Sequence, residues 1–496
     1  MSPFGDEAFY WLESRHPAWG YSDLPPLTAW LIWLGERVAG HGLVGMRWPF
    51  LLLGSALPWV MVAFGRRAFD ARAGWQAGLL CLALPLAGTF GVMAMPDVPL
   101  TLAIAVGLYA LLRAMDEGRL RDWLLLGFAL AAAWLTHYRA AMAMFAGLLL
   151  LACTPRGRAQ WRRGGLWLAL AVAALGLVPL IESNWRQHGA GIAFQLVDRN
   201  PWRFHADALV QPLEQAIACT PVLYVVLLWV LWTSWRRRCE GAPWDLLAWT
   251  SLGFLAPYFL LGLFADDQRF RAHWPLPGYL PLLAALPALC REAGRGWRVV
   301  SAAGGLLGGL GTLLGLGYLA LAASPRGADV LASGRAFPTH FVGWREGAAQ
   351  ARTLLQQRDA VLVADNFMLA AELEFQFGGQ RPVYSLDSGL NAKHGRASQL
   401  AVWQRDENGL RAAHAGEPML LVVSEVMRER ERLERLGAIC GSVEAPRLVT
   451  RLVLFSGRKS LAYYRGRVPD VLREGQAADP AQCVFWRNAR AAAEGV

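Results

Sequence analysis

Long apolar runs separated by short polar segments dominate the first two thirds of this 496-residue chain. A membrane-spanning helix needs about 20 mostly apolar residues, and several of these runs approach that length. Others are short or contain proline. The pattern predicts a mainly α-helical polytopic membrane domain with about ten spanning helices. The candidate runs are residues 43–64, 74–92, 98–113, 122–137, 139–153, 166–182, 216–235, 245–265, 274–290 and 299–323.

The pattern changes near residue 325, where apolar runs become short and alternate with charged segments. Strands are expected at residues 360–364, 418–423, 449–455 and 461–465, with helices at 366–377 and 424–436. Strands alternating with helices are typical of a small α/β domain. We therefore divide the chain into a first loop with an interfacial helix (1–42), a membrane domain (43–324) and a C-terminal α/β domain (325–496).

Arginines are distributed unequally among the short loops. Alternate loops hold nearly all of them: Arg66, Arg67, Arg72, Arg113, Arg119, Arg121, Arg156, Arg158, Arg162, Arg163, Arg236, Arg237, Arg238, Arg291, Arg295 and Arg298. The intervening short loops hold only Arg139, Arg269 and Arg271. The positive-inside rule places the arginine-rich loops in the cytoplasm, so the first loop and the C-terminal domain face outward. The net charge of +10 therefore reflects membrane topology, and we expect no nucleic-acid partner.

The first loop carries acidic residues beside aromatic ones. It begins Gly5-Asp6-Glu7-Ala8-Phe9-Tyr10-Trp11, and Asp23 precedes Pro25-Pro26-Leu27-Thr28-Ala29-Trp30. Acidic side chains are costly in lipid, so those beside spanning helices face water, a partner or a reaction. The alternative is a helix cap followed by a solvated turn.

The two stretches 6–11 and 25–30 together resemble the first outer loop of the GT-C glycosyltransferases that use polyprenyl-phosphate sugars. This group includes the lipid A aminoarabinose transferases and the protein O-mannosyltransferases. The chain departs from it at Leu24, where relatives usually have His or Lys. The resemblance implies a GT-C fold with a C-terminal extracytoplasmic domain. Relatives have one more spanning helix before this loop, so either such a helix is encoded ahead of Met1 or this chain lacks it.

The same resemblance implies a reaction and its location in the cell. A sugar would move from a polyprenyl-phosphate carrier to a cell-envelope acceptor: lipid A, another glycolipid or a protein. We expect this at the outer, periplasmic face of the bacterial inner membrane, with membrane lipids around the spanning helices.

The resemblance also implies catalytic residues. Asp6 matches the catalytic acidic position and is the candidate general base, with Glu7 as runner-up or as a first-turn helix charge. Asp97, in Met95-Pro96-Asp97-Val98-Pro99, matches a second functional acidic residue, although a helix N-cap would suit it equally. Tyr10 and Asp23 are assigned to the substrate loop.

The departing phosphate requires positive charge or a metal. Candidate phosphate contacts lie in loops that the positive-inside rule would leave uncharged. The planar guanidinium of arginine can donate two parallel hydrogen bonds to a phosphate. The alternative is that these residues only anchor the chain at the membrane interface. Residues 273–279 are similar to an H-W-P-x-P-x-Y run of relatives, and His137 stands where relatives often have Lys. The candidates are His137, Arg139, Arg269, Arg271 and His273.

No nucleotide-binding motif is present in the sequence, so no nucleotide cofactor is expected, and metal dependence is left open. The glycines of residues 304–317 predict close helix packing, and Cys440 is a candidate partner of Cys483. Two other functions are the alternatives to a glycosyltransferase. A secondary transporter would show an internal repeat with broken helices, which is not found. A non-catalytic envelope assembly subunit would be favoured if the changes at Leu24 and His137 abolish activity.

Overall fold

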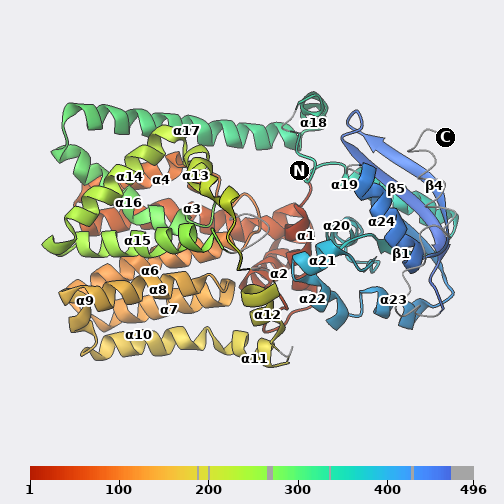
Figure 1. Ribbon diagram of the computed structural model, residues 1–496, viewed down its shortest axis with the longest axis horizontal. Coiled ribbons are helices and arrows are strands. Elements are labelled where there is room, and N and C mark those ends of the chain that lie inside the picture. Colours follow the sequence, from red (N-terminus) through yellow and green to blue (C-terminus); the bar gives the residue numbers. More distant parts are fainter. Residues whose placement is uncertain (187–188, 199–201, 265–271, 335–336, 426–428, 471–496) are drawn as a thin grey trace. The chain divides into compact units, whose positions relative to one another are not determined.

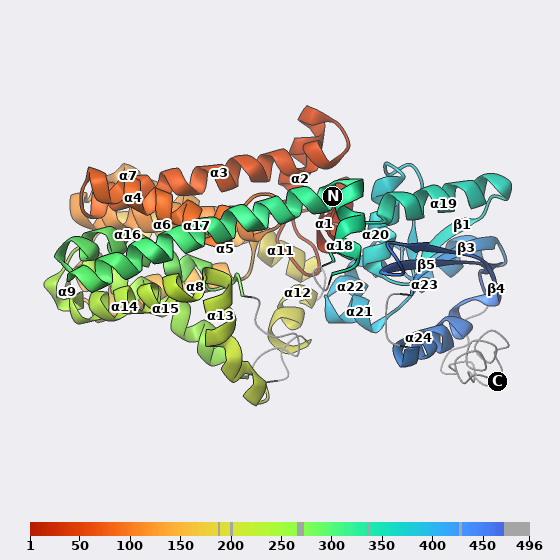
Figure 2. The same ribbon diagram turned by 90° about the horizontal axis from the view of Figure 1, so that it is seen from above.

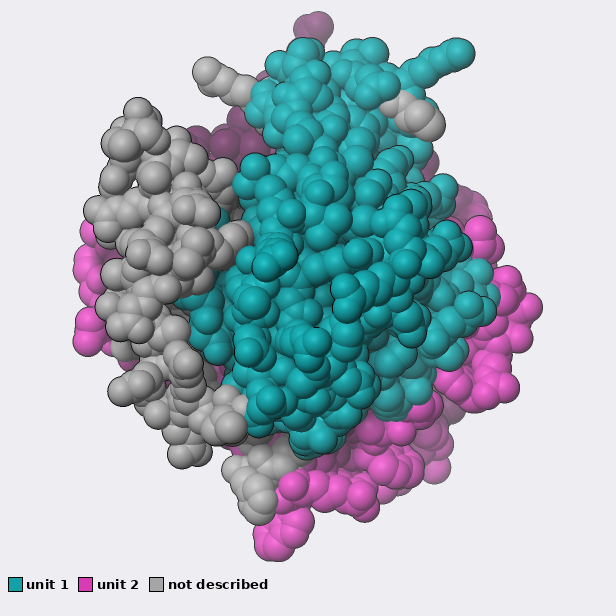
Figure 3. Space-filling model, turned by 90° about the vertical axis from the view of Figure 1, so that its right-hand side faces the viewer, with its two compact units in different colours: residues 1–16, 41–43, 319–496 teal, residues 17–40, 44–318 magenta. Residues whose placement is uncertain are grey.

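The computed structural model describes residues 1–186, 189–198, 202–264, 272–334, 337–425 and 429–470. The chain forms two compact units, coloured separately in Figure 3. Unit 1 contains residues 1–16, 41–43 and 319–496, and unit 2 contains residues 17–40 and 44–318. The first 42 residues are thus shared between the units. Cys483, Arg269 and Arg271 lie outside the described residues.

Unit 2 is a bundle of helices (Figures 1 and 2). Its helices are α2 (Leu27–Ala39), α3 (Leu43–Ala68), α4 (Ala71–Ala83), α5 (Pro85–Gly88), α6 (Asp97–Glu117), α7 (Leu120–Thr136), α8 (Ala140–Cys153), α9 (Pro155–Gln160), α10 (Gly164–Leu175), α11 (Val178–Arg186), α12 (Ala190–Ala193), α13 (Gln211–Cys219), α14 (Pro221–Arg236), α15 (Trp244–Leu261), α16 (Leu276–Glu292) and α17 (Arg295–Ala323). Each predicted spanning run overlaps one of them. Among the described residues, five helices are long and apolar enough to cross a membrane, or six if the pair bent by 111° at Thr220 counts as one span. The predicted fold class is confirmed.

Helix α16 lies at the centre of the bundle and contacts α4, α6, α14 and α15. Its residues from Leu276 to Leu289 are all buried, including Tyr279, whose hydroxyl donates to Gln215 at 2.9 Å. The glycine-rich run lies in α17. A Cβ added at Gly308 would lie 2.5 Å from the carbonyl oxygen of Ala83, so the predicted close packing of that run holds at this position.

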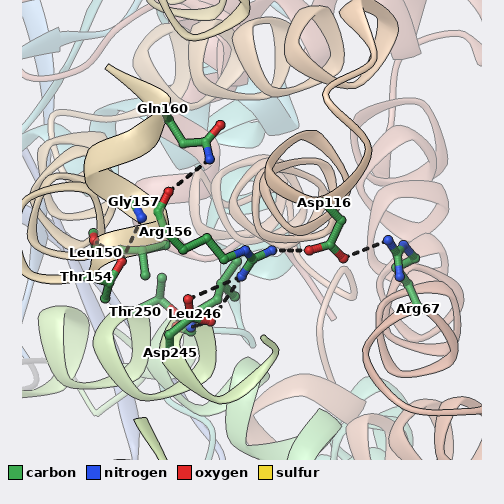
Figure 4. Close-up of polar contacts among 10 residues, drawn as sticks. All are labelled: Arg67, Asp116, Leu150, Thr154, Arg156, Gly157, Gln160, Asp245, Leu246 and Thr250. Atoms are coloured by element: carbon green, nitrogen blue, oxygen red, sulfur yellow. Dashed lines mark hydrogen bonds and ion pairs between the residues drawn. The ribbon is translucent and has the colours of Figure 1, made fainter. Parts of the chain in front are cut away.

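Arginines of the arginine-rich loops join the ends of several helices (Figure 4). Arg156 pairs with Asp116 and, at 3.1 Å, with the buried carboxylate of Asp245, while Arg67 reaches Asp116 at 2.7 Å. Thr154 caps α9 by accepting from the Gly157 N–H at 2.9 Å. The network ties α3, α6, α9 and α15 together. These arginines therefore stabilise the fold.

Unit 1 is a three-layer α/β domain. Its five-stranded sheet has the order β2-β1-β3-β5-β4. The strands are β1 (Val361–Ala364), β2 (Tyr384–Ser385), β3 (Pro418–Ser424), β4 (Glu444–Leu454) and β5 (Lys459–Arg467). β1 pairs in parallel with β2 and β3, whereas β5 is antiparallel to β3 and β4. The helices are α1 (Gly5–Arg15), α18 (Pro325–Ala332), α19 (Trp344–Gln357), α20 (Phe367–Gln376), α21 (Gly389–Lys393), α22 (Arg396–Val402), α23 (Glu407–His414) and α24 (Glu429–Ser442).

Successive strand residues point to opposite faces of this sheet, and both faces are buried. Leu362 and Ala364 pack with residues of α19 and α20, whereas Val363 packs with residues of α23 and α24. Figure 2 shows α19 and α24 on opposite sides of the strands. The continuous apolar runs of β1 and β3 follow from this double burial.

Helix α1 belongs to unit 1 because its aromatic residues pack on α20. Phe9 meets Phe367 edge-on with ring centroids 5.4 Å apart, and Trp11 meets Phe375 at 5.1 Å. Phe9 and Trp11 are completely buried. The N-terminal motif that the sequence places in a loop is thus a helix fixed to the α/β domain.

Candidate functional site

Asp6 lies in the first turn of α1, within unit 1. Its Oδ1 atom is 3.5 Å from the Arg396 guanidinium and 3.9 Å from His394 Nδ1. Although that oxygen is buried, it accepts no hydrogen bond within the part of the chain that the structure describes. The side chain is 16% exposed. A carboxylate that pairs with a cation but accepts no hydrogen bond at this oxygen can still accept a proton from a substrate hydroxyl.

Arg396, which the sequence did not single out, connects α1 to the α/β domain. Its guanidinium lies 3.3 Å from Glu13 as well as near Asp6, and it covers the faces of Phe9 at 4.3 Å and Tyr10 at 5.0 Å. The side chain is only 3% exposed. Arginine offers five donors in a planar fork, so a single side chain can serve two carboxylates and stack on aromatic rings.

Glu7 and Tyr10 are buried on the same helix. The Phe4 N–H donates to Glu7 Oε2 at 3.0 Å, which satisfies a backbone donor at the helix start. Glu7 is fully buried. Its observed contact is therefore that of a first-turn helix carboxylate, the alternative to catalysis. Tyr10 lies beneath Arg396.

The candidates Asp97, Arg139 and His273 come together in unit 2. Asp97 Oδ1 is 2.6 Å from Arg139 Nη2 and 3.3 Å from His273 Nε2. Asp97 does not cap its helix, since Pro96 is the N-cap of α6 and makes no side-chain cap bond. The guanidinium of Arg139 also lies 5.1 Å from the ring of Trp274, within cation–π range. Residues from three separate parts of the sequence thus form one charged cluster.

His137 and Asp23 are also buried in unit 2. Nδ1 of His137 accepts the Arg139 N–H at 3.1 Å, so this histidine shapes the turn that carries Arg139. The backbone carbonyl of Asp23 accepts from Gln195 Nε2 at 3.1 Å. Burial, together with the Asp23 carboxylate, raises the pKa of Tyr138 to about 12, so the Tyr138 hydroxyl stays protonated at neutral pH.

The predicted contacts Arg269 and Arg271 fall in the segment 265–271, outside the described residues. Within the described ranges, no group of three or more His, Cys, Asp or Glu side chains is arranged to hold a metal ion.

Comparison with known proteins identifies relatives that match between 63% and 75% of the chain. The family described as dolichyl-phosphate-mannose-protein mannosyltransferase matches residues 23–182. The chain is 24% identical over 379 residues to the lipid A galacturonosyltransferase RgtD of Rhizobium johnstonii, covering 75% of this chain and 76% of that protein. It is 26% identical over 336 residues to the undecaprenyl phosphate-alpha-4-amino-4-deoxy-L-arabinose arabinosyl transferase of Pseudomonas aeruginosa, covering 63% and 57%.

The fold is similar to that of ArnT from Cupriavidus metallidurans. The structure bound to undecaprenyl phosphate superposes with a TM-score of 0.60 at 16% identity, covering 89% of this chain and 88% of that one. The apo structure gives 0.59. These matches give no support to the transporter alternative, because the named relatives are transferases. The chain is a multi-pass membrane glycosyltransferase with the GT-C fold.

Proposed function

We propose that this glycosyltransferase moves a sugar from a polyprenyl-phosphate carrier to an envelope lipid, at the periplasmic face of the bacterial inner membrane. Two relatives support the substrates, since one is named for lipid A and the other for an undecaprenyl-phosphate sugar. The observation that carries the proposal is Asp6, at the head of the family-like motif, with a buried oxygen that accepts no hydrogen bond among the described residues.

In the proposed reaction, Asp6 removes the proton from an acceptor hydroxyl as that oxygen attacks the anomeric carbon of the donor sugar. The bond between this carbon and the phosphate oxygen breaks, and polyprenyl phosphate leaves with the electron pair. A positioned base contributes typically 10²–10⁴-fold to such a step. If the acceptor is a phosphate, no base is needed and Asp6 would orient it.

Negative charge develops on the departing phosphate, and fixed cationic groups stabilise it. Arg139 and His273 are proposed to supply this charge, with His137 forming their turn and with Arg269 and Arg271 as sequence-based partners. In this proposal Asp97 orients Arg139 and His273, which both contact its Oδ1 atom. Trp274 adds a second constraint on the Arg139 guanidinium.

The test is mass spectrometry of envelope lipids from cells with and without the gene. We expect one lipid species to lose a single sugar-sized mass increment in the deletion strain. The wild-type gene should restore it, and a gene carrying Asp6→Asn should not, at equal protein level. Identical lipid profiles in all strains would refute an envelope-lipid acceptor.

A further inference from the structure

A cavity of about 670 Å3 opens in unit 1 at the carboxyl ends of β1, β2 and β3. β1 lies between the other two, so the chain leaves β1 toward β2 and then crosses back to β3 on its other side. In open α/β sheets, ligands bind outside the carboxyl ends of the strands where the strand order reverses. The cavity is also within the size range of small-molecule sites. Position and volume independently indicate a binding site.

The charged groups of the cavity favour a cationic ligand over an anionic one. Asp365, directly after β1, is paired with Arg435 at 2.6 Å, which neutralises that arginine. Asp387, two residues after the end of β2, forms no ion pair with any described residue, and its own N–H donates to Glu407 Oε1 at 3.0 Å. Partial burial and the nearby Glu407 carboxylate raise the pKa of Asp387 to about 6, which leaves it ionised at pH 7.5.

The other basic groups that line the cavity, His340 and Lys459, carry little charge. Burial lowers the pKa of His340 below its usual value of 6.5 and that of Lys459 to about 7, so the imidazole and much of the amine are neutral at pH 7.5. The loop after β1 has no glycine (Asp365-Asn366-Phe367-Met368-Leu369), whereas phosphate-cradling loops depend on glycine for close backbone approach. A nucleotide or phosphorylated ligand is therefore disfavoured.

Other lining groups suit a hydroxylated ligand. Asn366, Ser388, Ser424 and Ser442 give the cavity a polar lining, and three of them, Asn366, Ser388 and Ser442, are held in place by hydrogen bonds within the domain. Gly5 also lines it, one residue before Asp6. We propose that this cavity binds an amino sugar, and that it holds the saccharide headgroup of the acceptor next to the Asp6 helix. The acceptor role rests on the proposed function, whereas the binding of an amino sugar does not depend on it.

The experiment compares three hexoses that differ in charge, using full-length protein in lipid nanodiscs and saturation-transfer NMR at pH 7.5. The probes are glucosamine, glucose and glucuronate. We expect saturable millimolar binding of glucosamine, weaker binding of glucose and the weakest binding of glucuronate. Asp387→Asn should weaken glucosamine binding about 10-fold, because one charge-assisted hydrogen bond is lost.

Two further variants test whether glucosamine binds in the cavity or only to carboxylates on the protein surface. Gly389 lines the cavity and an added Cβ would meet no atom within 4 Å, so Gly389→Trp should fold and block binding. Asp359→Asn makes the same chemical change as Asp387→Asn at a residue that is 82% exposed and precedes β1 at the other end of the strand. It should leave binding unchanged. Tightest binding of glucuronate, no binding of glucosamine, or equal binding by wild type and Gly389→Trp would overturn the proposal.

Transfer assays on the same preparations distinguish the two proposals. If the protein binds glucosamine but transfers no sugar, the cavity remains assigned as an amino-sugar site and the transferase substrates proposed above are refuted. If Gly389→Trp transfers sugar with an unchanged acceptor KM, the proposed transferase function stands and the acceptor role of the cavity is refuted. We expect a raised acceptor KM with little change in donor affinity.

Discussion

Arg139 is held by the Asp97 carboxylate and lies over the Trp274 indole ring, which is more than a membrane anchor requires. If it contacts the donor phosphate, losing that charged contact should cost about 1.5–3 kcal/mol, or roughly 10- to 150-fold in donor affinity. Arg139→Ala should show this loss, and Arg139→Lys should recover only part of it because lysine lacks the planar fork. Displacement of labelled polyprenyl phosphate measures the affinity.

Arg186→Ala is the matched control for Arg139→Ala. Arg186 is 72% exposed and pairs with Glu182 on the surface of α11, so its removal should leave donor affinity unchanged. Equal affinity for wild type and Arg139→Ala would reassign Arg139 to a structural role.

Arg396 and Glu13 form a buried ion pair, with side chains 3% and 1% exposed. Breaking such a pair by removing one partner typically costs about 3–5 kcal/mol, because a charge is left buried. Arg396→Met should destabilise unit 1 by roughly that amount in denaturant unfolding. Adding Glu13→Gln should restore part of the loss. Additive effects of the two substitutions would show that the pair is not coupled.

Residues within motifs could be predicted from the sequence, whereas the residues that contact them in the fold could not. Asp97, Arg139 and His273 were each predicted separately, and the structure brings them together. Arg396 lies 383 residues from Glu13 in the chain and belongs to no motif. No local pattern relates the two residues, so only the folded chain reveals their pairing.

Among the elements, the ends of α6, α9 and α15 depend on Arg156. Its removal would leave the carboxylate of Asp245, which is 2% exposed, without its cation. We expect Arg156→Ala to lower the free energy of unfolding by about 3 kcal/mol. Arg162→Ala removes a solvent-exposed arginine from the same loop and should change stability by less than about 0.5 kcal/mol. Thermal unfolding in nanodiscs compares them; equal melting temperatures for both variants would contradict this role.

Elements with a strong pattern were predicted closely. The runs 360–364 and 418–423 correspond to β1 and β3, since both strands are buried on two faces and read as continuous apolar segments. β2 was missed because two residues are too few to show a period. The predicted run 74–92 is interrupted because α4 ends at Ala83 and Pro85 begins a new helix.

Across the whole molecule, Lys459 should make stability depend on pH. Its pKa is about 7 in the folded protein against 10.5 ordinarily. Between these values the unfolded chain holds the proton and the folded chain does not, so stability rises as pH rises. From pH 7 to 9.5 this group should add about 3 kcal/mol. Lys459→Met should remove that increment, as measured by unfolding at both pH values. An identical pH slope in the two proteins would contradict the lowered pKa.

Division of the chain into compact units was the feature least visible in the sequence. Composition predicted a membrane domain and an α/β domain, yet residues 1–16 fold with the latter. The cause is the aromatic face of α1, which packs on α20 more than 350 residues later. Phe9 and Trp11 were placed in the first loop, because their packing partners lie so far along the chain.

The central claim is that Asp6 activates an acceptor for transfer of a lipid-linked sugar. Purified protein in proteoliposomes, supplied with a radiolabelled polyprenyl-phosphate sugar and an envelope lipid extract, tests it directly. Wild-type protein should move label to an envelope lipid. Asp6→Asn should transfer at least about 100-fold more slowly while binding polyprenyl phosphate as tightly as wild type. Near wild-type transfer by Asp6→Asn, or label that stays on the donor with wild-type protein, would contradict the account.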